Sequence, residues 1–402
     1  MCDIIEIKAG NMEGYMTRQI INAKIVLPDR ILEDGVCRFT DGVIDYIGHE
    51  AIDGVPTVDA AGQYLFAGFV DIHCHGGGGY DFMDATPDEM LEISKFHLSH
   101  GTTTLVATTM TDADEAIFAA LDRFAEIPED ARLTLHGVHL EGPWLSPAQC
   151  GAQDVSKMSK PTAERLQWIK EKYPFVERVS VAPEVEGGLE VGRAGQELGI
   201  VMAIAHTDAD YDMTLLAADN GYTLTTHHYS GMKGVVRVNA YRVAGCIEAG
   251  LVDDRFTCEV IADGKHLPSG LLKLIYKCKG ADRICLITDG MRGAGLPDGE
   301  ETMLGRMNDG VKCIIEDGVA KLPDRQSFAG SVATTDRLFR TMHTLAEVDF
   351  VNLSKMLSLT PARVMGYEDR GSIEIGKNAD LLIIDENLKI NKIFLKGAEY
   401  AS

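Results

Sequence analysis

Short apolar runs rich in β-branched residues alternate with helical patterns through the middle of the chain. Eight such runs occur between residues 67 and 291, and most are followed by a segment of helical length. Strands that alternate with helices are typical of a parallel sheet covered by helices, and eight repeats favour closure into a barrel. We therefore predict an α/β fold, a (β/α)8 TIM-like barrel. Its predicted strands are Ala67–His73, Thr102–Met110, Leu133–Glu141, Arg178–Glu184, Ile200–His206, Tyr222–Tyr229, Phe256–His266 and Ile284–Met291.

The two ends of the chain carry a different pattern, in which short strands are separated by tight turns. Asp41-Gly42, between two strand-like runs, is a typical hairpin signal. Neither end supplies enough strands for a sheet of its own. We therefore predict that residues 17–66 and 367–402 together form a small β-sandwich domain beside the barrel, which takes residues 67–366.

Two further segments have their own patterns. Asp317-Gly318 separates two strand-like runs after the last barrel strand, which predicts a hairpin insertion near residues 308–324 that could extend the sandwich. Residues 1–16 show no strong pattern, and we expect them to form a loosely held N-terminal extension.

Composition and charge narrow the class of partner. Hydrophobic residues make up 45% and charged residues 25% of the 402 residues, which is typical of globular proteins. Asp and Glu number 61 against 38 Lys and Arg, so the formal net charge is −23. Such a surface repels nucleic-acid phosphates and anionic membranes, which argues against both as partners. An anionic substrate would need a locally basic site.

The cysteines and the amino-terminal residues favour a cytoplasmic location. Nine cysteines are scattered along the chain with no Cys-x-x-Cys pair, so we expect reduced thiols rather than a disulfide framework. The first twenty residues include Asp3, Glu6, Lys8 and Glu13, which leaves no apolar signal core. The apolar runs are far shorter than a membrane span.

Histidines and carboxylates follow six of the eight predicted strands, at the end of the barrel where active sites gather. His73 and His75 are two residues apart on a strand, so both rings point to one face. Glu141, His206 and His227 end three other strands, and the two oxygens of Glu141 can bridge two ions. Imidazole and carboxylate groups suit a divalent metal, zinc first, with iron, manganese or nickel as alternatives and one or two ions per subunit.

Asp289 ends the last predicted strand and is the expected catalytic group. A carboxylate beside the metal can take a proton from the attacking water and pass it to the leaving group. His139 shares a strand face with Glu141, and we expect it to orient that glutamate.

Longer motifs follow one another along the chain: AGFVDIHCHGGGGYDFMDA from residue 67, HLEGPWLS from 139, AHTDAD from 205, TTHHYSGM from 225, IADGKH from 261, LITDGMRGAGLPDG from 286, FAGSVATTDR from 328, LSLTPARVMG from 357 and GSIEIGKNADLLIID from 371. From about residue 20 to the C-terminus, this series resembles the N-acetylglucosamine-6-phosphate deacetylases, a branch of the amidohydrolase superfamily. The resemblance implies a metal-bearing barrel with a β-sandwich, a homodimer, and hydrolysis of the acetamide of a 2-acetamido sugar 6-phosphate.

The resemblance also implies roles for the residues at the strand ends. Asp289 is the general acid and base. The ligands of a principal metal are Glu141, His206 and His227, and the pair that matches members with a second metal is His73 and His75.

Substrate contacts follow from the same resemblance, with departures. His266 matches a sugar contact, and Arg237 lies near the place of a phosphate-binding arginine from the neighbouring subunit, one residue short of the usual spacing. Gln153 replaces a histidine that polarises the amide carbonyl, and it can donate a hydrogen bond to the oxyanion but carries no charge. Ser230 and Gly231 replace an Asn-Ala pair that borders the phosphate site.

Other functions stay open at this point. The substrate could be the N-acetylgalactosamine epimer or another N-acyl amino sugar. A cyclic-amide hydrolase of the dihydroorotase or hydantoinase kind bridges two metals with a carboxylated lysine on the fourth strand, but here that strand ends in Ala182-Pro183-Glu184. A catalytically dead sugar-phosphate-binding regulator predicts loss of a ligand or of Asp289, and none is lost.

Overall fold

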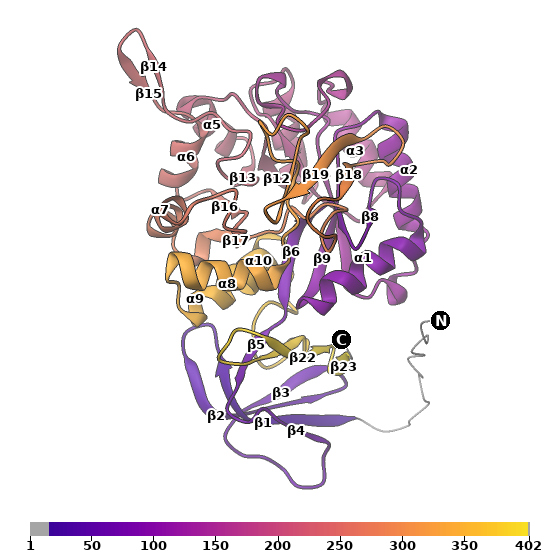
Figure 1. The fold of residues 1–402 in the computed structure, drawn as a ribbon, viewed down its shortest axis with the longest axis vertical. Helices are drawn as coiled ribbons and strands as arrows, with labels where there is room; N and C mark the ends of the chain where they lie inside the picture. The colour runs from indigo at the N-terminus through magenta and orange to yellow at the C-terminus, as the bar shows by residue number, and fades with distance from the viewer. Residues whose placement is uncertain (1–15, 401–402) are drawn as a thin grey trace.

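The computed structural model describes residues 16–400, so the predicted N-terminal extension, residues 1–16, lies outside the described residues apart from Met16. Eight parallel strands form a barrel (Figure 1). They are β6 (Phe69–Cys74), β9 (Thr102–Thr109), β10 (Leu135–Glu141), β11 (Val176–Val181), β12 (Val201–Ile204), β13 (Tyr222–Thr225), β16 (Thr257–Val260) and β17 (Ile284–Leu286). They pair in the order β17-β16-β13-β12-β11-β10-β9-β6, and a parallel bridge between Cys74 and Gly290 nearly closes the ring. The predicted (β/α)8 architecture is confirmed.

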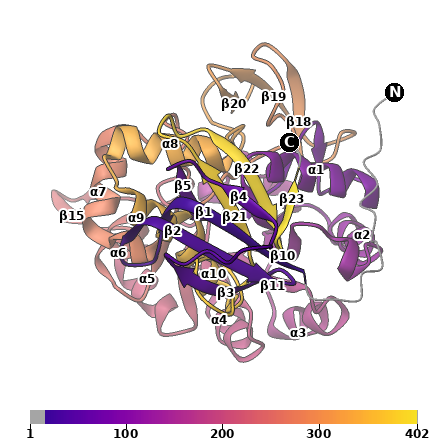
Figure 2. The ribbon, with the colours of Figure 1, turned by 90° about the horizontal axis from the view of Figure 1, so that it is seen from below.

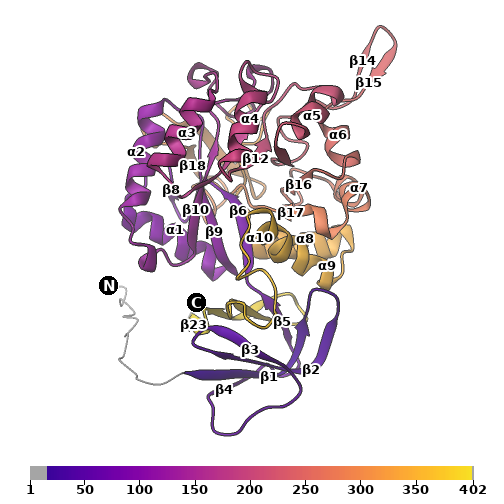
Figure 3. The ribbon, with the colours of Figure 1, turned by 180° about the vertical axis from the view of Figure 1, so that it is seen from behind.

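Helices cover the outside of the barrel (Figure 3). The first of them, α1 (Pro87–Ser99), begins with a capping box, in which Thr86 and Glu89 each accept a hydrogen bond from the other's backbone N–H. It ends before Gly101, whose φ of +94° suits a helix stop. The other helices are α2 (Asp114–Ala125), α3 (Ala163–Lys172), α4 (Gly188–Glu197), α5 (Tyr211–Ala218), α6 (Cys246–Val252), α7 (Ser269–Lys279), α8 (Thr335–Ala346), α9 (Phe350–Ser354) and α10 (Thr360–Val364), with a π-helical segment, Lys355–Leu359, between the last two.

Strands from both chain ends form a second, mixed sheet below the barrel (Figures 1 and 2). They are β1 (Thr17–Val26), β2 (Ile31–Thr40), β3 (Val43–Gly48), β4 (Thr57–Asp59), β5 (Tyr64–Ala67), β21 (Leu381–Ile384), β22 (Ile390–Leu395) and β23 (Ala398–Tyr400). The order is β23-β22-β21-β5-β1-β2-β3, with β4 beside β1. Phe39 of β2 and Phe394 of β22 have ring centroids 6.3 Å apart although three strands lie between them, so this single sheet folds over its own core. The predicted union of the two ends is confirmed.

The predicted insertion forms a hairpin, but it does not join the sheet made by the chain ends. Its strands β19 (Val311–Glu316) and β20 (Val319–Lys321) pair with β18 (Glu301–Leu304) in a separate three-stranded sheet. The idea that this hairpin could extend the sandwich is therefore wrong. The physical reason is that β18, just before the hairpin, already satisfies the backbone of β19.

Two short hairpins lie at the carboxyl ends of the barrel strands. The first pairs β7 (Gly76–Gly77) with β8 (Tyr80–Asp81) just after the first barrel strand. The second pairs β14 (Val236–Val238) with β15 (Tyr241–Val243) and projects away from the barrel (Figures 1 and 3). Because β5 leads directly into β6, the small sheet lies at the opposite, amino-terminal end of the strands.

The expectations about thiols and membranes can be compared with the described part of the chain. The eight cysteines within residues 16–400 are all free thiols, and Cys2 lies outside that range. Among the helices of the same range, none combines the length and the apolar character needed to cross a bilayer.

Candidate active site

The carboxyl ends of the barrel strands surround a cavity of about 310 Å³. Nine of the residues expected at the site line it: His75, Glu141, Gln153, His206, His227, Ser230, Gly231, His266 and Asp289. His73 is fully buried beside them, with its Nε2 atom 3.3 Å from Nε2 of His75. Within one chain, Arg237 is the only expected site residue that the structure does not bring to this cavity.

Glu141 lies at the centre of the site and faces two groups of histidines. Its Oε1 atom is 2.8 Å from Nε2 of His227 and 3.3 Å from Nε2 of His206. Its Oε2 atom is 3.1 Å from Nε2 of His75 and 3.7 Å from Nε2 of His73. In each group, three possible ligand atoms lie within 4.8 Å of one another. One buried carboxylate therefore connects two clusters that could each hold a metal ion.

The outer hydrogen bonds of the histidines indicate that a proton or a metal ion lies between each ring and Glu141. Nδ1 of His206 lies 2.8 Å from the carbonyl oxygen of Gln149, and Nδ1 of His227 lies 3.2 Å from that of Ser230. Because a carbonyl oxygen can only accept, each Nδ1 carries a proton, and a neutral ring then turns its Nε2 lone pair toward Glu141. A lone pair and a carboxylate oxygen repel at these distances unless a proton or a metal ion lies between them. The donor set of imidazole and carboxylate suits a divalent transition metal.

Asp289 completes the cluster. Its Oδ1 atom is 3.2 Å from Nε2 of His75 and 3.4 Å from Nε2 of His73. Burial raises the pKa of the Asp289 carboxyl, but the charges of His73 and His75 outweigh burial and hold this pKa below its ordinary value. Burial alone would lower the pKa of His75. Its hydrogen bonds to Asp289 and Glu141 outweigh burial and raise this pKa to about 10. Asp289 is therefore ionised and can accept a proton.

Three residues of the site have an unusual backbone. His206, His227 and Asp289 have φ angles of 43°, 31° and 47°, in the left-handed region that residues other than glycine rarely adopt. Such positions cost on the order of 1–3 kcal/mol each and persist only where the surrounding structure enforces them. Each comes shortly after a barrel strand, and all three side chains line the cavity. Strain of this kind is concentrated at functional sites.

Two polar residues near Glu141 make contacts that were not predicted from the sequence. The amide nitrogen of Gln153 donates to Oε2 of Glu141 at 3.0 Å, and its oxygen accepts from the backbone of Thr111. An amide nitrogen has two N–H groups, so one stays free to face a substrate. His139 was expected to orient Glu141, but its Nε2 atom bonds the hydroxyl of Ser180 at 2.7 Å instead. That expectation is wrong, because a nearer hydroxyl on the adjacent strand takes the ring nitrogen.

His266 and Gly231 also line the cavity, and close contacts fix the position of each. Nδ1 of His266 lies 2.8 Å from a carboxylate oxygen of Asp263, so the ring is held by its outer nitrogen. Gly231 has a φ of +57°, and a Cβ atom placed there would lie 2.7 Å from Nδ1 of His206. The close approach of the chain to this histidine therefore requires glycine.

Arg237 lies on the projecting β14–β15 hairpin, where it is exposed to solvent. The same hairpin also exposes apolar side chains: Val235 is 56%, Val238 50% and Tyr241 78% exposed. Figure 1 shows the hairpin pointing away from the barrel. An exposed apolar projection of this kind is typical of a surface that contacts another protein.

A protein-family model described as "Amidohydrolase family" matches residues 64–399. The chain belongs to the amidohydrolase family. The match runs from the strand before the barrel to the end of the small sheet and includes both histidine clusters and Asp289. With its two buried His/Glu clusters, the protein is a metal-dependent amidohydrolase.

This amidohydrolase is similar over nearly its whole length to deacetylases of amino-sugar phosphates. It is 32% identical over 364 residues to the N-acetylglucosamine-6-phosphate deacetylase of Lysinibacillus sphaericus, covering 89% of this chain and 91% of that protein. It is 31% identical over 391 residues to the N-acetylgalactosamine-6-phosphate deacetylase of Escherichia coli O157:H7, covering 95% and 99%. These two identities are nearly equal, so the similarity does not separate the epimers.

A solved structure agrees with these sequence relatives. It is a variant of the N-acetyl-D-glucosamine-6-phosphate deacetylase of Mycobacterium smegmatis in complex with N-acetyl-D-glucosamine-6-phosphate. The TM-score is 0.88 at 28% sequence identity, and the match covers 96% of this chain and 100% of that chain. The barrel and the small sheet of this amidohydrolase therefore have the same arrangement as in that enzyme.

A buried ion pair below the site was missed in the sequence. Arg178 of β11 and Glu259 of β16 are fully buried, and their side chains form a salt bridge. Arg178 also donates to the carbonyl oxygen of Ile72 at 2.8 Å. Glu259 lies 3.3 Å from Nδ1 of His73 and accepts from the backbone N–H of His227 at 3.3 Å. A charged residue within an otherwise apolar strand was the signal that could have revealed this pair.

Removing one side of this pair is expected to destabilise the amidohydrolase. Arg178→Met leaves Glu259 as a buried charge without its partner, which typically lowers the free energy of unfolding by about 3–5 kcal/mol. Arg30→Met is the control, because Arg30 pairs with Asp29 on the surface, where such pairs contribute roughly 0.2–1 kcal/mol. Urea unfolding measures both variants. Equal small losses would contradict a structural role of the buried pair.

Proposed function

We propose that this amidohydrolase hydrolyses the acetamide of N-acetylglucosamine 6-phosphate, giving glucosamine 6-phosphate and acetate. The observation that carries the proposal is the position of Asp289 against the two histidine clusters joined by Glu141. His266 and the turn at Ser230 line the same cavity and supply polar groups for a sugar phosphate. N-acetylgalactosamine 6-phosphate is the second candidate, because a deacetylase of that substrate is 31% identical over 95% of this chain.

The metal assignments belong to the same proposal. Glu141, His206 and His227 would hold the principal ion, and His73 and His75 would hold a second ion together with Glu141. Zinc is the first choice, and iron, manganese and nickel accept the same donors. When bound, such an ion polarises the amide carbonyl and favours ionisation of water.

The side chains of this chain supply the other steps. Asp289 accepts a proton from the attacking water at a carboxylate oxygen and delivers it to the nitrogen of the leaving amine. The free N–H of Gln153 faces the carbonyl oxygen, where charge develops during attack. His266, held by Asp263, orients the sugar ring. Gln153 also fixes the rotamer of Glu141 through its other N–H group.

A cyclic-amide hydrolase is a weaker alternative. That chemistry needs a lysine after the fourth barrel strand, β11, where this chain has Ala182-Pro183-Glu184. The carboxylate of Glu184 accepts from the hydroxyl of Thr207 at 2.5 Å and the backbone N–H of Asp208 at 2.6 Å. Glu184 is thus engaged in these contacts, and Glu141 is the carboxylate that faces both histidine clusters.

We also propose a homodimer in which Arg237 binds the phosphate of the neighbouring subunit's substrate. The exposed apolar side chains on the β14–β15 hairpin support a protein contact there. Arg325 lines the cavity of the same chain, but its guanidinium is paired with Glu316. With a net charge of −23, the chain gains a second cation for a phosphate if Arg237 of a neighbouring subunit reaches this cavity. In a two-fold dimer the hairpin of each subunit contacts the other subunit, so each active site gains one arginine from its partner.

Mixing two inactive variants tests this arrangement. We expect Asp289→Asn and Arg237→Ala to be nearly inactive alone, and subunit exchange to restore activity at about a quarter of all sites, since one site of each hybrid holds both native residues. The measurement is acetate release before and after exchange, with exchange verified by differently tagged subunits. No recovery after complete exchange would mean that Arg237 does not act across the interface.

The substrate itself is tested with a panel. Acetate release is measured on N-acetylglucosamine and N-acetylgalactosamine, each with and without the 6-phosphate. We expect the highest kcat/KM for N-acetylglucosamine 6-phosphate and a loss of at least about 100-fold without the phosphate, which removes a charge-assisted contact. A preference for the galactosamine epimer would move the assignment to the second candidate, and no release from any of the four would reject the proposal.

A further inference from the structure

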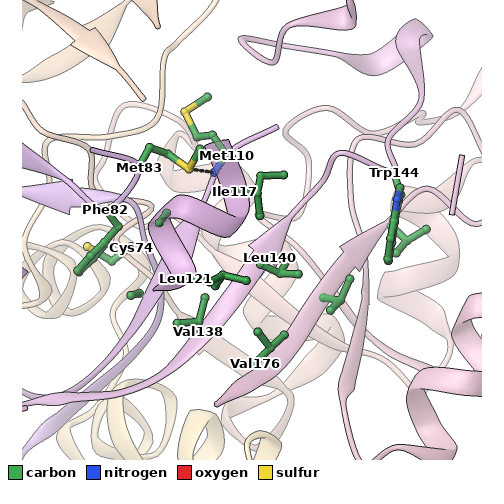
Figure 4. Packing of buried hydrophobic residues seen from close by; sticks show 14 of the residues in the cluster. Cys74, Phe82, Met83, Met110, Ile117, Leu121, Val138, Leu140, Trp144 and Val176 are labelled. Carbon is green, nitrogen blue, oxygen red and sulfur yellow. Dashed lines mark hydrogen bonds between the residues drawn. The ribbon is translucent and has the colours of Figure 1, made fainter. Parts of the chain in front are cut away.

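A second cavity, of about 490 Å³, opens beside the first. The two cavities share a wall of five residues: Met110, Gly151, Ala152, Gln153 and Leu304. Next to this wall the second cavity is apolar, and Met83, Met110 and Leu304 are almost completely buried. Figure 4 shows Met83 against Met110, where the sulfur of Met83 lies 3.3 Å from the backbone nitrogen of Met110. Methionine side chains are flexible and adapt to groups of different shape.

The order of the barrel strands puts the second cavity on the side of the barrel opposite Ser230. Met110 follows β9, whereas Ser230, proposed to border the phosphate, follows β13. These two strands are four places apart in the eight-strand ring and therefore lie on opposite sides of the barrel. A sugar phosphate with its phosphate near Ser230 and its amide near Asp289 directs its acyl group toward Met110 and the second cavity.

The charged side chains that line the second cavity are partly exposed, and most of them are paired with one another. Arg306 contacts Asp112 at 2.9 Å and Asp309 at 2.7 Å. Lys157 lies 3.7 Å from Asp112. Asp154 adds a third carboxylate to the lining, so carboxylates outnumber cations. The cavity therefore favours a neutral aliphatic chain and repels an anionic one.

We propose that this amidohydrolase also deacylates amino-sugar 6-phosphates whose N-acyl chain is longer than acetyl, with the chain in the second cavity. The inference rests on the proposed function. The reaction is balanced by one water: the amide C–N bond breaks, a C–O bond forms, and both protons of the water end on the amine nitrogen, the first through Asp289. In a site closed around the acetyl group, an added methylene would lower kcat/KM by about 10-fold or more, because the longer chain would clash with the wall. The second cavity gives the longer chain room and avoids that clash.

The test compares glucosamine 6-phosphate carrying acetyl, propionyl, butyryl or succinyl groups. In the native protein we expect kcat/KM for butyryl within about tenfold of that for acetyl, and for the anionic succinyl at least about 100-fold lower. Leu322→Trp fills the second cavity, since Leu322 lines that cavity and is not among the residues of the first. It should lower the ratio of butyryl to acetyl turnover at least about tenfold and leave acetyl turnover unchanged. Met307→Trp, at a 52% exposed position just before the hairpin insertion that carries Leu322, should leave the ratio unchanged.

The results separate a failure of this inference from a failure of the proposed function. Acetyl turnover reports whether a variant is folded, and Val311→Phe, also in the lining of the second cavity only, replaces Leu322→Trp if that variant fails to fold. A fall of about 100-fold or more from acetyl to butyryl in the native protein would overturn the inference, as would an unchanged ratio in the filled variant. If the protein releases no acetate from any of the N-acetylated sugar phosphates, the proposed function itself fails, and the inference about longer acyl chains fails with it.

Discussion

Replacing Asp289 with asparagine is expected to lower the turnover of N-acetylglucosamine 6-phosphate by about 10,000-fold. General acid–base residues contribute roughly 100- to 10,000-fold, and here one carboxylate carries out the proton transfer from water and the transfer to the amine. Asparagine has nearly the same size, and its oxygen can keep the contacts to His73 and His75. The fold and the metal content should therefore stay those of the native protein. Steady-state kinetics and elemental analysis measure the two effects.

A second buried carboxylate provides the control. Asp81 is fully buried but accepts hydrogen bonds from the backbone of Met83 and Gly305 and is not among the residues that line the reaction cavity. Asp81→Asn should keep turnover within about tenfold, because it leaves the proton path intact, although its amide nitrogen then faces one backbone N–H and lowers the stability of the fold. Near-native turnover in Asp289→Asn, with full metal content, would reject Asp289 as the catalytic group.

Removing the ligands in steps is expected to remove the metals in steps. The native protein should hold two ions, and His73→Gln with His75→Gln should leave one ion and part of the activity. Glu141→Ala should lose both ions, because each oxygen of Glu141 faces one cluster. A metal ion contributes several kcal/mol to the transition state, so this loss should lower turnover by at least about 1,000-fold. Elemental analysis after growth with ample metal gives the number of ions per chain.

His228 provides a matched control for these histidine changes. It adjoins His227 in sequence and is also buried, but its ring bonds the hydroxyl of Thr225 rather than Glu141. His228→Gln should therefore keep both ions. One ion in the native protein, unchanged when His73 and His75 are replaced, would contradict the second metal position.

The barrel, and the grouping of its site residues at one end of the strands, could be predicted from local sequence patterns. Eight apolar runs predicted eight strands. Because parallel strands bring their carboxyl ends to one rim, Glu141, His206 and His227 could be predicted to lie close together before any distance between them was measured. The two chain ends could be joined for a similar reason, since neither had enough strands alone. These inferences needed only the period of the sequence and the chirality of βα units.

Other features depend on contacts that no local pattern contains. The ion pair of Arg178 and Glu259 joins residues 81 positions apart in the chain, and each one alone reads as a polar interruption of a strand. The hydrogen bond from Gln153 to Glu141 depends on how a long loop folds back over the barrel. The left-handed backbone at His206 and Asp289 could not be predicted either, because even Asp and His adopt it at only a small fraction of their positions.

The most direct measurement follows the products of N-acetylglucosamine 6-phosphate by proton NMR with three preparations of the native protein. These are the metal-loaded protein, the same protein after chelation, and the chelated protein after zinc is restored. We expect one acetate for each free amine formed in the first and third preparations, and a rate at least about 1,000-fold lower in the second. Equal rates with and without metal, or a metal-loaded protein that releases no acetate, would contradict a metal-dependent deacetylase.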